Sequence, residues 1–219
     1  MPLSLAEHAR TVVGIDPIDR FSKAGVRLAA ERGVHNLRFV QADGMALPFA
    51  DGLFDLLLSH AVIEHVADAR RYLRECRRVL APTGLLYLST GPYLSMAGAH
   101  LPRLKVPVPL HLIFGRKAAF KTFRWLARHA AWTLKEPAHE NSFIRDAIHG
   151  VDKEDDLLEK VRVAGLREHI AEAGLRIVSE ELHATTTVRR MPKPIGRWMR
   201  TSALVQDIFI NNMEYVLAR

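Results

Sequence analysis

Asp16 stands where a short apolar segment ends, a position from which its carboxylate could bind a sugar. It closes Val-Val-Gly-Ile-Asp at residues 12–16 and is followed by a proline. In open parallel sheets, ligands bind beyond the carboxyl ends of the strands, and a carboxylate there can accept hydrogen bonds from both hydroxyls of a ribose. The alternative is that Asp16 only caps a helix that begins near Ile18.

Asp43 occupies a similar position after a second apolar segment, Phe-Val-Gln-Ala at residues 39–42. Its carboxylate could accept a hydrogen bond from the amino group of an adenine while the backbone at Gly44 lies against the ring. The alternative is an Asx turn ahead of Gly44, in which the side chain bonds only to nearby backbone.

The first ninety residues alternate short, apolar, β-branched runs with longer amphipathic stretches. Strands are predicted at residues 11–15, 37–41, 54–59 and 85–90, and helices at 18–32 and 67–80. Gly33 is a plausible cap for the first helix, and Pro82 and Gly84 stop the second. This order is typical of βαβ units around a parallel sheet, so an α/β fold is predicted.

Four segments then carry a resemblance to a known family, because they follow one another in its order and spacing. They are Val-Val-Gly-Ile-Asp-Pro (12–17), Gln-Ala-Asp-Gly-Met-Ala-Leu-Pro-Phe (41–49), Phe-Asp-Leu-Leu-Leu-Ser-His-Ala-Val-Ile-Glu-His-Val (54–66) and Leu-Arg-Glu-Cys-Arg-Arg-Val-Leu-Ala-Pro-Thr-Gly-Leu-Leu-Tyr-Leu-Ser (73–89). Over roughly residues 5–92 the chain resembles class I S-adenosylmethionine-dependent methyltransferases of the type 11 group, which includes ubiquinone and menaquinone C-methyltransferases. The resemblance implies a Rossmann-like, mostly parallel sheet with an antiparallel carboxyl-terminal strand.

The same resemblance implies S-adenosylmethionine as the cofactor and assigns roles to four residues. Asp16 would hold the ribose, Asp43 and Gly44 would contact the adenine, and His60 would lie beside the sulfonium. For an oxygen or nitrogen acceptor, His60 is the best-placed base, since a histidine titrates near neutral pH. The alternative is that His60 packs at the edge of the cofactor without moving a proton.

Two further predictions concern the residues around His60. Glu64 and His65 are expected to cap and pack at the start of the next helix. No metal is expected, because the strand end at Ser59 and His60 offers no cluster of carboxylates.

The first strand of the family and the Gly-x-Gly turn after it have no counterpart in this sequence. In the family's sheet that strand lies between those that here end at Asp16 and Ser59. Losing it would leave backbone groups unpaired on both neighbours, so we expect a chain truncated before the glycine-rich motif, by a misassigned start codon or a shortened gene. Such a chain would bind the cofactor poorly. The alternative is a non-catalytic, methyltransferase-like binding module.

The chain divides into a methyltransferase domain at residues 1–92 and 160–219 and a helical, basic insertion at residues 93–159. From Tyr93 to His149 there are nine Lys or Arg residues and only three acids. A helix is predicted at residues 117–131. Its apolar face would be formed by Phe120, Phe123, Ala127, Ala130 and Ala131.

Three roles fit this insertion. The favoured one is a lid over the pocket for the methyl acceptor. It could also contact an anionic membrane surface through Trp125 and Trp132, in which case the acceptor would be a lipid or a quinone. Binding of nucleic acid, as in a nucleic-acid methyltransferase, is the least favoured.

The carboxyl-terminal part is predicted to return to the sheet, with a helix at residues 163–173 and strands at 175–181 and 214–218 that form an antiparallel hairpin. A second basic stretch lies between these strands. It contains Arg189, Arg190, Lys193, Arg197 and Arg200, interleaved with Pro192, Pro194 and Trp198. It is either a solvated loop with a short helix or a contact for a phosphate-bearing or acidic acceptor.

Composition sets the outer limits of function. The chain has 219 residues, 48% of them hydrophobic, which is enough for one domain with an elaboration, and a net charge of +7, which allows an anionic partner. Its single cysteine, Cys76, is expected to be buried, and it suits a reducing cytoplasm. The amino terminus does not resemble a secretory signal, and no apolar run is long enough to cross a bilayer.

The predicted function is methyl transfer from S-adenosylmethionine to a small-molecule or lipid-like acceptor. The predicted location is the cytoplasm, at the membrane periphery if the insertion contacts lipid. A nicotinamide oxidoreductase is disfavoured, since the sequence lacks a glycine fingerprint and a Tyr-x-x-x-Lys pair. The sequence leaves the oligomeric state open.

Overall fold

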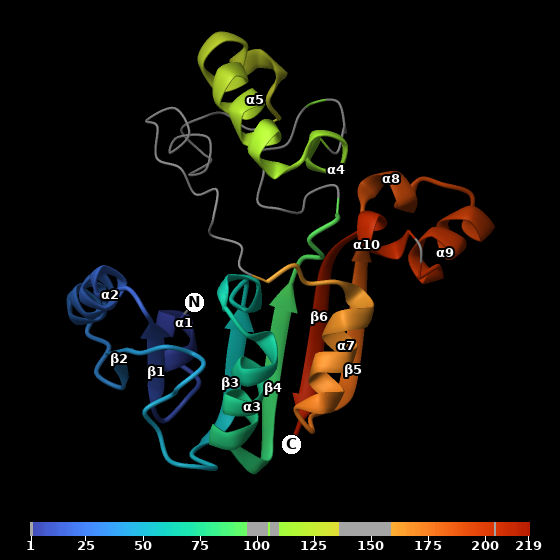
Figure 1. The fold of residues 1–219 in the computed structure, drawn as a ribbon. Helices are drawn as coiled ribbons and strands as arrows, with labels where there is room; N and C mark the ends of the chain where they lie inside the picture. The colour runs from blue at the N-terminus through green and yellow to red at the C-terminus, as the bar shows by residue number, and fades with distance from the viewer. Residues whose placement is uncertain (1, 96–104, 106–109, 136–158, 204) are drawn as a thin grey trace.

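The described strands of the protein form two sheets (Figure 1). The structure is a computed structural model that describes residues 2–95, 105, 110–135, 159–203 and 205–219. In the smaller sheet, β1 (Val12–Asp16) pairs in parallel with β2 (Leu37–Gln41). In the larger, β3 (Phe54–His60) pairs in parallel with β4 (Leu80–Thr90).

The larger sheet is completed by a carboxyl-terminal hairpin. β6 (Ile210–Ala218) lies between β4 and β5 (Arg176–Ala184) and is antiparallel to both. It is therefore the only described strand that runs against the others, which confirms the predicted α/β class with a mostly parallel sheet and an antiparallel carboxyl-terminal strand. Within the described residues, no strand pairs with the second edge of β1 or with the second edge of β3.

The two helices predicted in the first ninety residues are confirmed to within two residues. α2 (Asp19–Glu31) ends where Gly33 adopts a φ of +65°, a conformation that glycine reaches without a steric penalty. α3 (Ala69–Val79) begins after Asp68, whose side chain accepts a hydrogen bond from the backbone N–H of Arg71 at 2.9 Å.

The strand predicted at residues 85–90 is longer than expected, because β4 already begins at Leu80, immediately after α3. Leu80 is fully buried and pairs in register with Phe54, and a bulge between Phe54 and Leu56 absorbs the extra residues of β4. The helix ends before Pro82 and Gly84, as predicted, but both residues lie within β4.

The core lies between the larger sheet and two helices on one face of it, α3 and α7 (Val163–Glu172) (Figure 1). Cys76 is buried there as predicted, and burial raises the pKa of its thiol to about 12. On the other face, Leu56 and Leu85 are neighbours in register and are both exposed.

The remaining described elements are short helices and one longer helix in the predicted insertion. They are α1 (Pro2–Ala6), η1 (Ile63–His65), α4 (Leu110–Phe114), α5 (Arg116–His129), η2 (Ala131–Thr133), α8 (Thr186–Arg189), α9 (Lys193–Thr201) and α10 (Gln206–Phe209). None of the described helices combines the length and the apolar character that a bilayer span requires.

α5 confirms the helix predicted in the insertion, and Phe123 and Ala127 are buried as expected. The prediction was wrong for Ala131, which is exposed because it lies beyond the end of α5, in η2. The parts of the insertion at residues 96–104, 106–109 and 136–158 lie outside the described residues. The division into two domains stays a prediction.

Asp207 joins the carboxyl-terminal hairpin to α7. Its side chain is 4% exposed and accepts hydrogen bonds from the backbone N–H of Val163 at 2.7 Å and from Nε of Arg162 at 2.8 Å. The helix has no side-chain cap from its own N-cap residue. A carboxylate 44 residues away in sequence therefore caps α7.

We expect Asp207→Ala to lower the free energy of unfolding by about 2 kcal/mol, because it leaves a buried N–H without an acceptor. Urea denaturation followed by circular dichroism measures this. Glu172→Ala is the control on the same helix, since it removes an ion pair with Arg70 in which both side chains are exposed. Equal losses in the two variants would contradict the capping role.

Candidate functional site

Asp16 and Asp43 lie together at the carboxyl edge of the smaller sheet. Asp16 is the last residue of β1 and pairs in register with Gln41, the last residue of β2, two positions before Asp43. The backbone N–H of Ala42 also bonds to the carbonyl of Asp16 at 3.2 Å. The structure thus brings the two carboxylates to one edge, as the sequence predicted.

The capping alternative for Asp16 is present in the structure. Its Oδ1 accepts a hydrogen bond from the backbone N–H of Ile18 at 2.7 Å. Its Oδ2 has no hydrogen-bond partner among the described residues. One carboxylate oxygen therefore orders the turn into α2, and the other stays available to a ligand.

The Asx-turn alternative for Asp43 is present in the same way. Its Oδ1 accepts from the backbone N–H of Met45 at 2.9 Å. A Cβ added to Gly44 would lie 2.8 Å from Cε2 of Tyr72, so a side chain at this position would collide with that ring. Glycine is required here for a packing reason as well as for any contact with a ligand.

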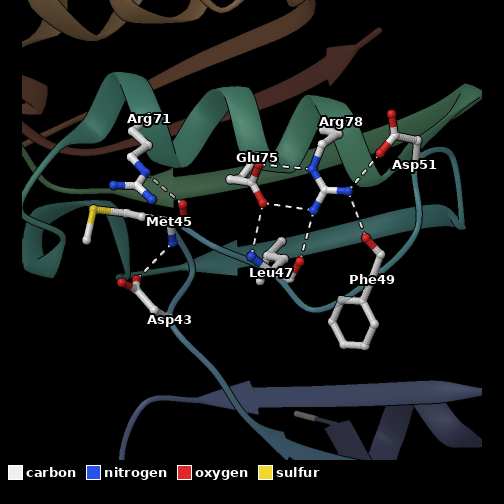
Figure 2. Close-up of polar contacts among 8 residues, drawn as sticks. All are labelled: Asp43, Met45, Leu47, Phe49, Asp51, Arg71, Glu75 and Arg78. Carbon is white, nitrogen blue, oxygen red and sulfur yellow. Dashed lines mark hydrogen bonds and ion pairs between the residues drawn. The ribbon is translucent and has the colours of Figure 1, made fainter.

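The loop that follows Asp43 is held by one face of α3 (Figure 2). Arg78 donates hydrogen bonds to the carbonyls of Phe49 and Leu47 at 2.7 and 2.9 Å. It also pairs with Glu75 at 2.9 Å and with Asp51 at 2.8 Å. These bonds, which we call the α3 clamp, fix the loop to the helix. The carboxylates of Glu75 and Asp51 raise the pKa of Arg78.

Glu75 and Arg71 complete the α3 clamp. Oε2 of Glu75 accepts from the backbone N–H of Leu47 at 3.0 Å, and Nε of Arg71 donates to the carbonyl of Met45 at 3.0 Å. The hydrogen bonds from Arg78 hold the pKa of Glu75 below its ordinary value. Arg71, Glu75 and Arg78 lie on one face of the helix at spacings of four and three residues, so all three point at the loop.

Tyr72 links the Asp43 loop to the end of β3. Its ring lies against Gly44, and its hydroxyl donates to Oγ of Ser59 at 2.8 Å. Both side chains are buried, and burial raises the pKa of Tyr72. Ser59 directly precedes His60, so this contact fixes the strand end that carries the histidine.

His60 is the last residue of β3 and is exposed. The residue after it, Ala61, has a φ of +52°, the one such value among the described residues other than glycine. Its N–H bonds to the carbonyl of Ser89 at 2.8 Å, which holds it in this conformation. Residues of this kind are strained and concentrate at functional sites. No sequence signal marks Ala61.

A row of polar side chains extends from His60 across the sheet. Ser89 is its neighbour in register on β4, and Glu214 is the neighbour of Ser89 on β6, so these side chains leave the same face. Nδ2 of Asn212 donates to Ser89 at 3.2 Å and to Glu214 at 2.9 Å, and Nε2 of His183 lies 3.2 Å from Glu214. Sequence reasoning missed this row, although alternation of Asn212 and Glu214 with apolar residues on β6 was a usable signal.

Glu64 and His65 do not open α3 as predicted, because they belong to the separate 3-10 turn η1. Glu64 is 6% exposed and accepts from the hydroxyl of Thr90 at 2.8 Å. It therefore packs at the ends of β3 and β4, in agreement with the predicted packing role. Among the described side chains, no three of His, Cys, Asp or Glu converge as metal ligands would.

Comparisons with known proteins bear on this site. Residues 1–88 match a family model described as a methyltransferase domain. YcgJ of Bacillus subtilis (strain 168), named an uncharacterized methyltransferase, is 31% identical over 110 residues, which are 48% of this chain and 44% of that protein. An uncharacterized methyltransferase of Mycobacterium sp. (strain JLS) is 39% identical over 116 residues, 53% of this chain and 42% of that protein. The chain thus covers less than half of the length of these relatives.

Solved structures agree on the fold. The crystal structure of YcgJ from Bacillus subtilis matches with a TM-score of 0.55 at 16% identity, over 98% of this chain and 84% of that one. SpnF, described as a [4+2]-cyclase, matches with a TM-score of 0.56 at 17% identity, over 98% of this chain and 68% of that one. At such identities the likeness shows the fold alone, and it confirms the predicted Rossmann-like class.

The α3 clamp makes stability depend on pH in a defined direction. The folded-state pKa of Glu75 lies below its ordinary value of 4.5, so its charge stabilises the fold above pH 4.5 and this contribution is lost as the pH falls through the folded-state pKa. We expect Glu75→Gln to be less stable than the parent by about 1–2 kcal/mol at neutral pH. The difference should shrink in acid, which urea denaturation across a pH series measures. A difference that stays constant with pH would contradict the ionic part of the clamp.

Proposed function

We propose that the protein, whose residues 1–88 match a methyltransferase domain model, transfers the methyl group of S-adenosylmethionine to a small-molecule or lipid-like acceptor. The observation that carries the proposal is the pair Asp16 and Asp43. Each stands at the end of one of two neighbouring parallel strands, and each uses one carboxylate oxygen for the local turn. The second oxygens are suited to hydroxyl and amino donors of a nucleoside.

In this proposal the adenosine part of the cofactor lies along the carboxyl edge of the smaller sheet. Oδ2 of Asp16 accepts from the ribose hydroxyls, and Oδ2 of Asp43 accepts from the adenine amino group. The backbone at Gly44 lies against the adenine ring, while the position that a Cβ would occupy faces Tyr72. The α3 clamp supports this arrangement because it holds the loop after Asp43 in one conformation.

His60 acts on the acceptor. The bound cofactor supplies an activated methyl on a sulfonium, whose thioether leaves as a neutral group. The chain itself must hold the acceptor in line with that methyl, which can supply about 7–11 kcal/mol of the barrier. For an oxygen or nitrogen acceptor, the imidazole of His60 takes the proton that the acceptor loses. Its exposure at the end of β3 gives an acceptor access to it.

The insertion supplies the acceptor side of the site. α5 lies beyond the carboxyl ends of β3 and β4 in Figure 1, the end of the sheet at which His60 stands. We assign it the role of a lid that selects the acceptor, and we assign the protein to the cytoplasm. A helix in this position can cover an acceptor without contacting the adenosine site.

A non-catalytic binding module is the second candidate. It is favoured by one observation: within the described residues no strand pairs with the second edge of β1 or of β3, where the strand before the family's glycine-rich turn would lie. Such a module would bind the cofactor or its product without methyl transfer. Incubation with S-adenosylmethionine carrying a labelled methyl group and a bacterial lipid and metabolite extract distinguishes the two, since only an enzyme gives labelled product. For an oxygen or nitrogen acceptor, this labelling should also require His60.

Asp16→Asn separates ligand binding from capping. An asparagine oxygen still accepts from the N–H of Ile18, but its amide replaces the free carboxylate oxygen. We expect the variant to keep its melting temperature and to lose roughly 10–100-fold in affinity for S-adenosylmethionine, measured by isothermal titration calorimetry up to millimolar ligand. Asp55→Asn, an exposed substitution on β3, is the control.

Two results would overturn the proposal for Asp16. One is unchanged affinity in Asp16→Asn, which would leave only the capping role. The other is the absence of saturable binding of both S-adenosylmethionine and its demethylated product to the parent chain.

Asp43→Asn tests the adenine contact in the same way, because the asparagine oxygen preserves the bond to the N–H of Met45.

A further inference from the structure

An exposed apolar stripe lies on α9 and just before it. Ile195 and Trp198 are 48% and 57% exposed, and their spacing of three residues puts them on one side of the helix. Met191, two residues before the helix begins, is 40% exposed. The helix is anchored through other positions, since Gly196 and Met199 are buried and Gly196 lies against the carbonyl of Val188. Ile195 and Trp198 are therefore not part of the attachment of α9 to the fold.

Basic side chains border this stripe. Arg189, Arg190, Lys193, Arg197 and Arg200 are all exposed. From residue 182 to residue 206 the sequence contains no Asp or Glu, and no described carboxylate forms an ion pair with any of the five. The α9 surface, which we define as the stripe and these five residues, thus combines exposed apolar area with positive charge that no described carboxylate neutralises.

α5 presents a second surface of the same composition. Lys117, Lys121 and Trp125 follow one another at intervals of four residues, and all three are exposed. Trp132, just beyond the helix, is 74% exposed, and Phe114, just before it, is 65% exposed. In Figure 1, α5 and α9 both lie at the end of the molecule toward which β3 and β4 run. α5 and α9 therefore both place exposed tryptophan and basic side chains at this end of the fold.

We propose that this end of the protein docks on a lipid bilayer with anionic headgroups. Ile195 and Trp198 enter the boundary between headgroups and acyl chains, and Arg and Lys of the α9 surface contact the phosphates, with Trp125 and Trp132 as further contacts. Nucleic acid would use the same positive charge, but exposed aliphatic side chains such as Met191 and Ile195 gain nothing from a phosphate backbone. The combination of aliphatic, indole and basic groups fits an anionic bilayer.

This inference goes beyond the proposed function, since docking requires neither cofactor nor acceptor. It also has a consequence for the site. The carboxyl ends of β1 and β3, which carry Asp16 and His60, face the same end of the molecule as α5 in Figure 1. An acceptor dissolved in the bilayer would reach the methyl transfer site from the docked side.

The test is sedimentation of the full chain with phosphatidylcholine vesicles that either contain or lack phosphatidylglycerol. We expect binding only to the anionic vesicles, and loss of it at high salt. Lys193→Glu combined with Arg197→Glu should weaken binding about tenfold or more, because each basic residue near an anionic surface contributes to attraction. Ile195→Ser combined with Trp198→Ser should weaken it at unchanged net charge.

Arg27→Glu combined with Arg32→Glu is the matched control. Both arginines are exposed, and they lie on and beside α2, at the other edge of the molecule from α9. The charge change equals that of the α9 variant, so equal losses of binding in the two would mean attraction by net charge alone and would overturn the docking surface. Tighter binding to a short DNA duplex than to anionic vesicles would overturn it in favour of nucleic acid.

A fluorescence measurement keeps the proposal testable even if an α9 variant fails to fold. The chain has three tryptophans, so Trp125→Phe with Trp132→Phe leaves Trp198 as the only one. We expect anionic vesicles to shift its emission to shorter wavelength and brominated lipids to quench it. An unshifted spectrum with vesicles bound would remove Trp198 from the contact and overturn the role of α9. No S-adenosylmethionine is present, so failure of the methyltransferase proposal would leave this result unchanged.

Discussion

The attachment of the Asp43 loop to α3 is the constraint on which the candidate site depends. The described strands form two sheets with no ladder of hydrogen bonds between them, so backbone pairing does not set the position of β1 and β2 relative to β3. The α3 clamp takes over that role, because Arg78 and Glu75 bond to backbone groups of the loop while the helix packs on the larger sheet. Charged groups bonded to backbone carbonyls hold a loop more strongly than neutral ones do.

A second connection uses packing instead of charge. The ring of Tyr72 fills the space beside Gly44 while its hydroxyl reaches Ser59, so one buried side chain contacts both the Asp43 loop and the end of β3. A buried tyrosine needs a partner for its hydroxyl, and Ser59 supplies it. The two connections leave from the same helix, which makes α3 the part of the fold that relates the proposed adenosine site to His60.

The local turns show why the structural and ligand-binding interpretations of an aspartate need not exclude each other. Asp16 and Asp43 each accept one backbone N–H two residues on, and a carboxylate has a second oxygen with further acceptor capacity. Ordering the turn with one oxygen also restricts the rotation of the side chain. The turn therefore preorganises the other oxygen for a ligand, which lowers the entropic cost of binding.

The sequence by itself determined the local elements and the positions of the candidate residues. Periodicity, caps and breakers predicted β1, β2, α2, α3 and α7 to within two residues, and Asp16 and Asp43 were recognised because strand ends are local features. His60 was proposed from the resemblance of the local sequence around it to the family. It did not reveal the α3 clamp, the Tyr72 to Ser59 bond or the cap of α7 by Asp207. These join residues 31, 13 and 44 positions apart, and no pattern of neighbouring residues specifies which distant polar groups will meet. Tertiary packing decided them, since burying a helix against a sheet forces every enclosed polar group to find a partner.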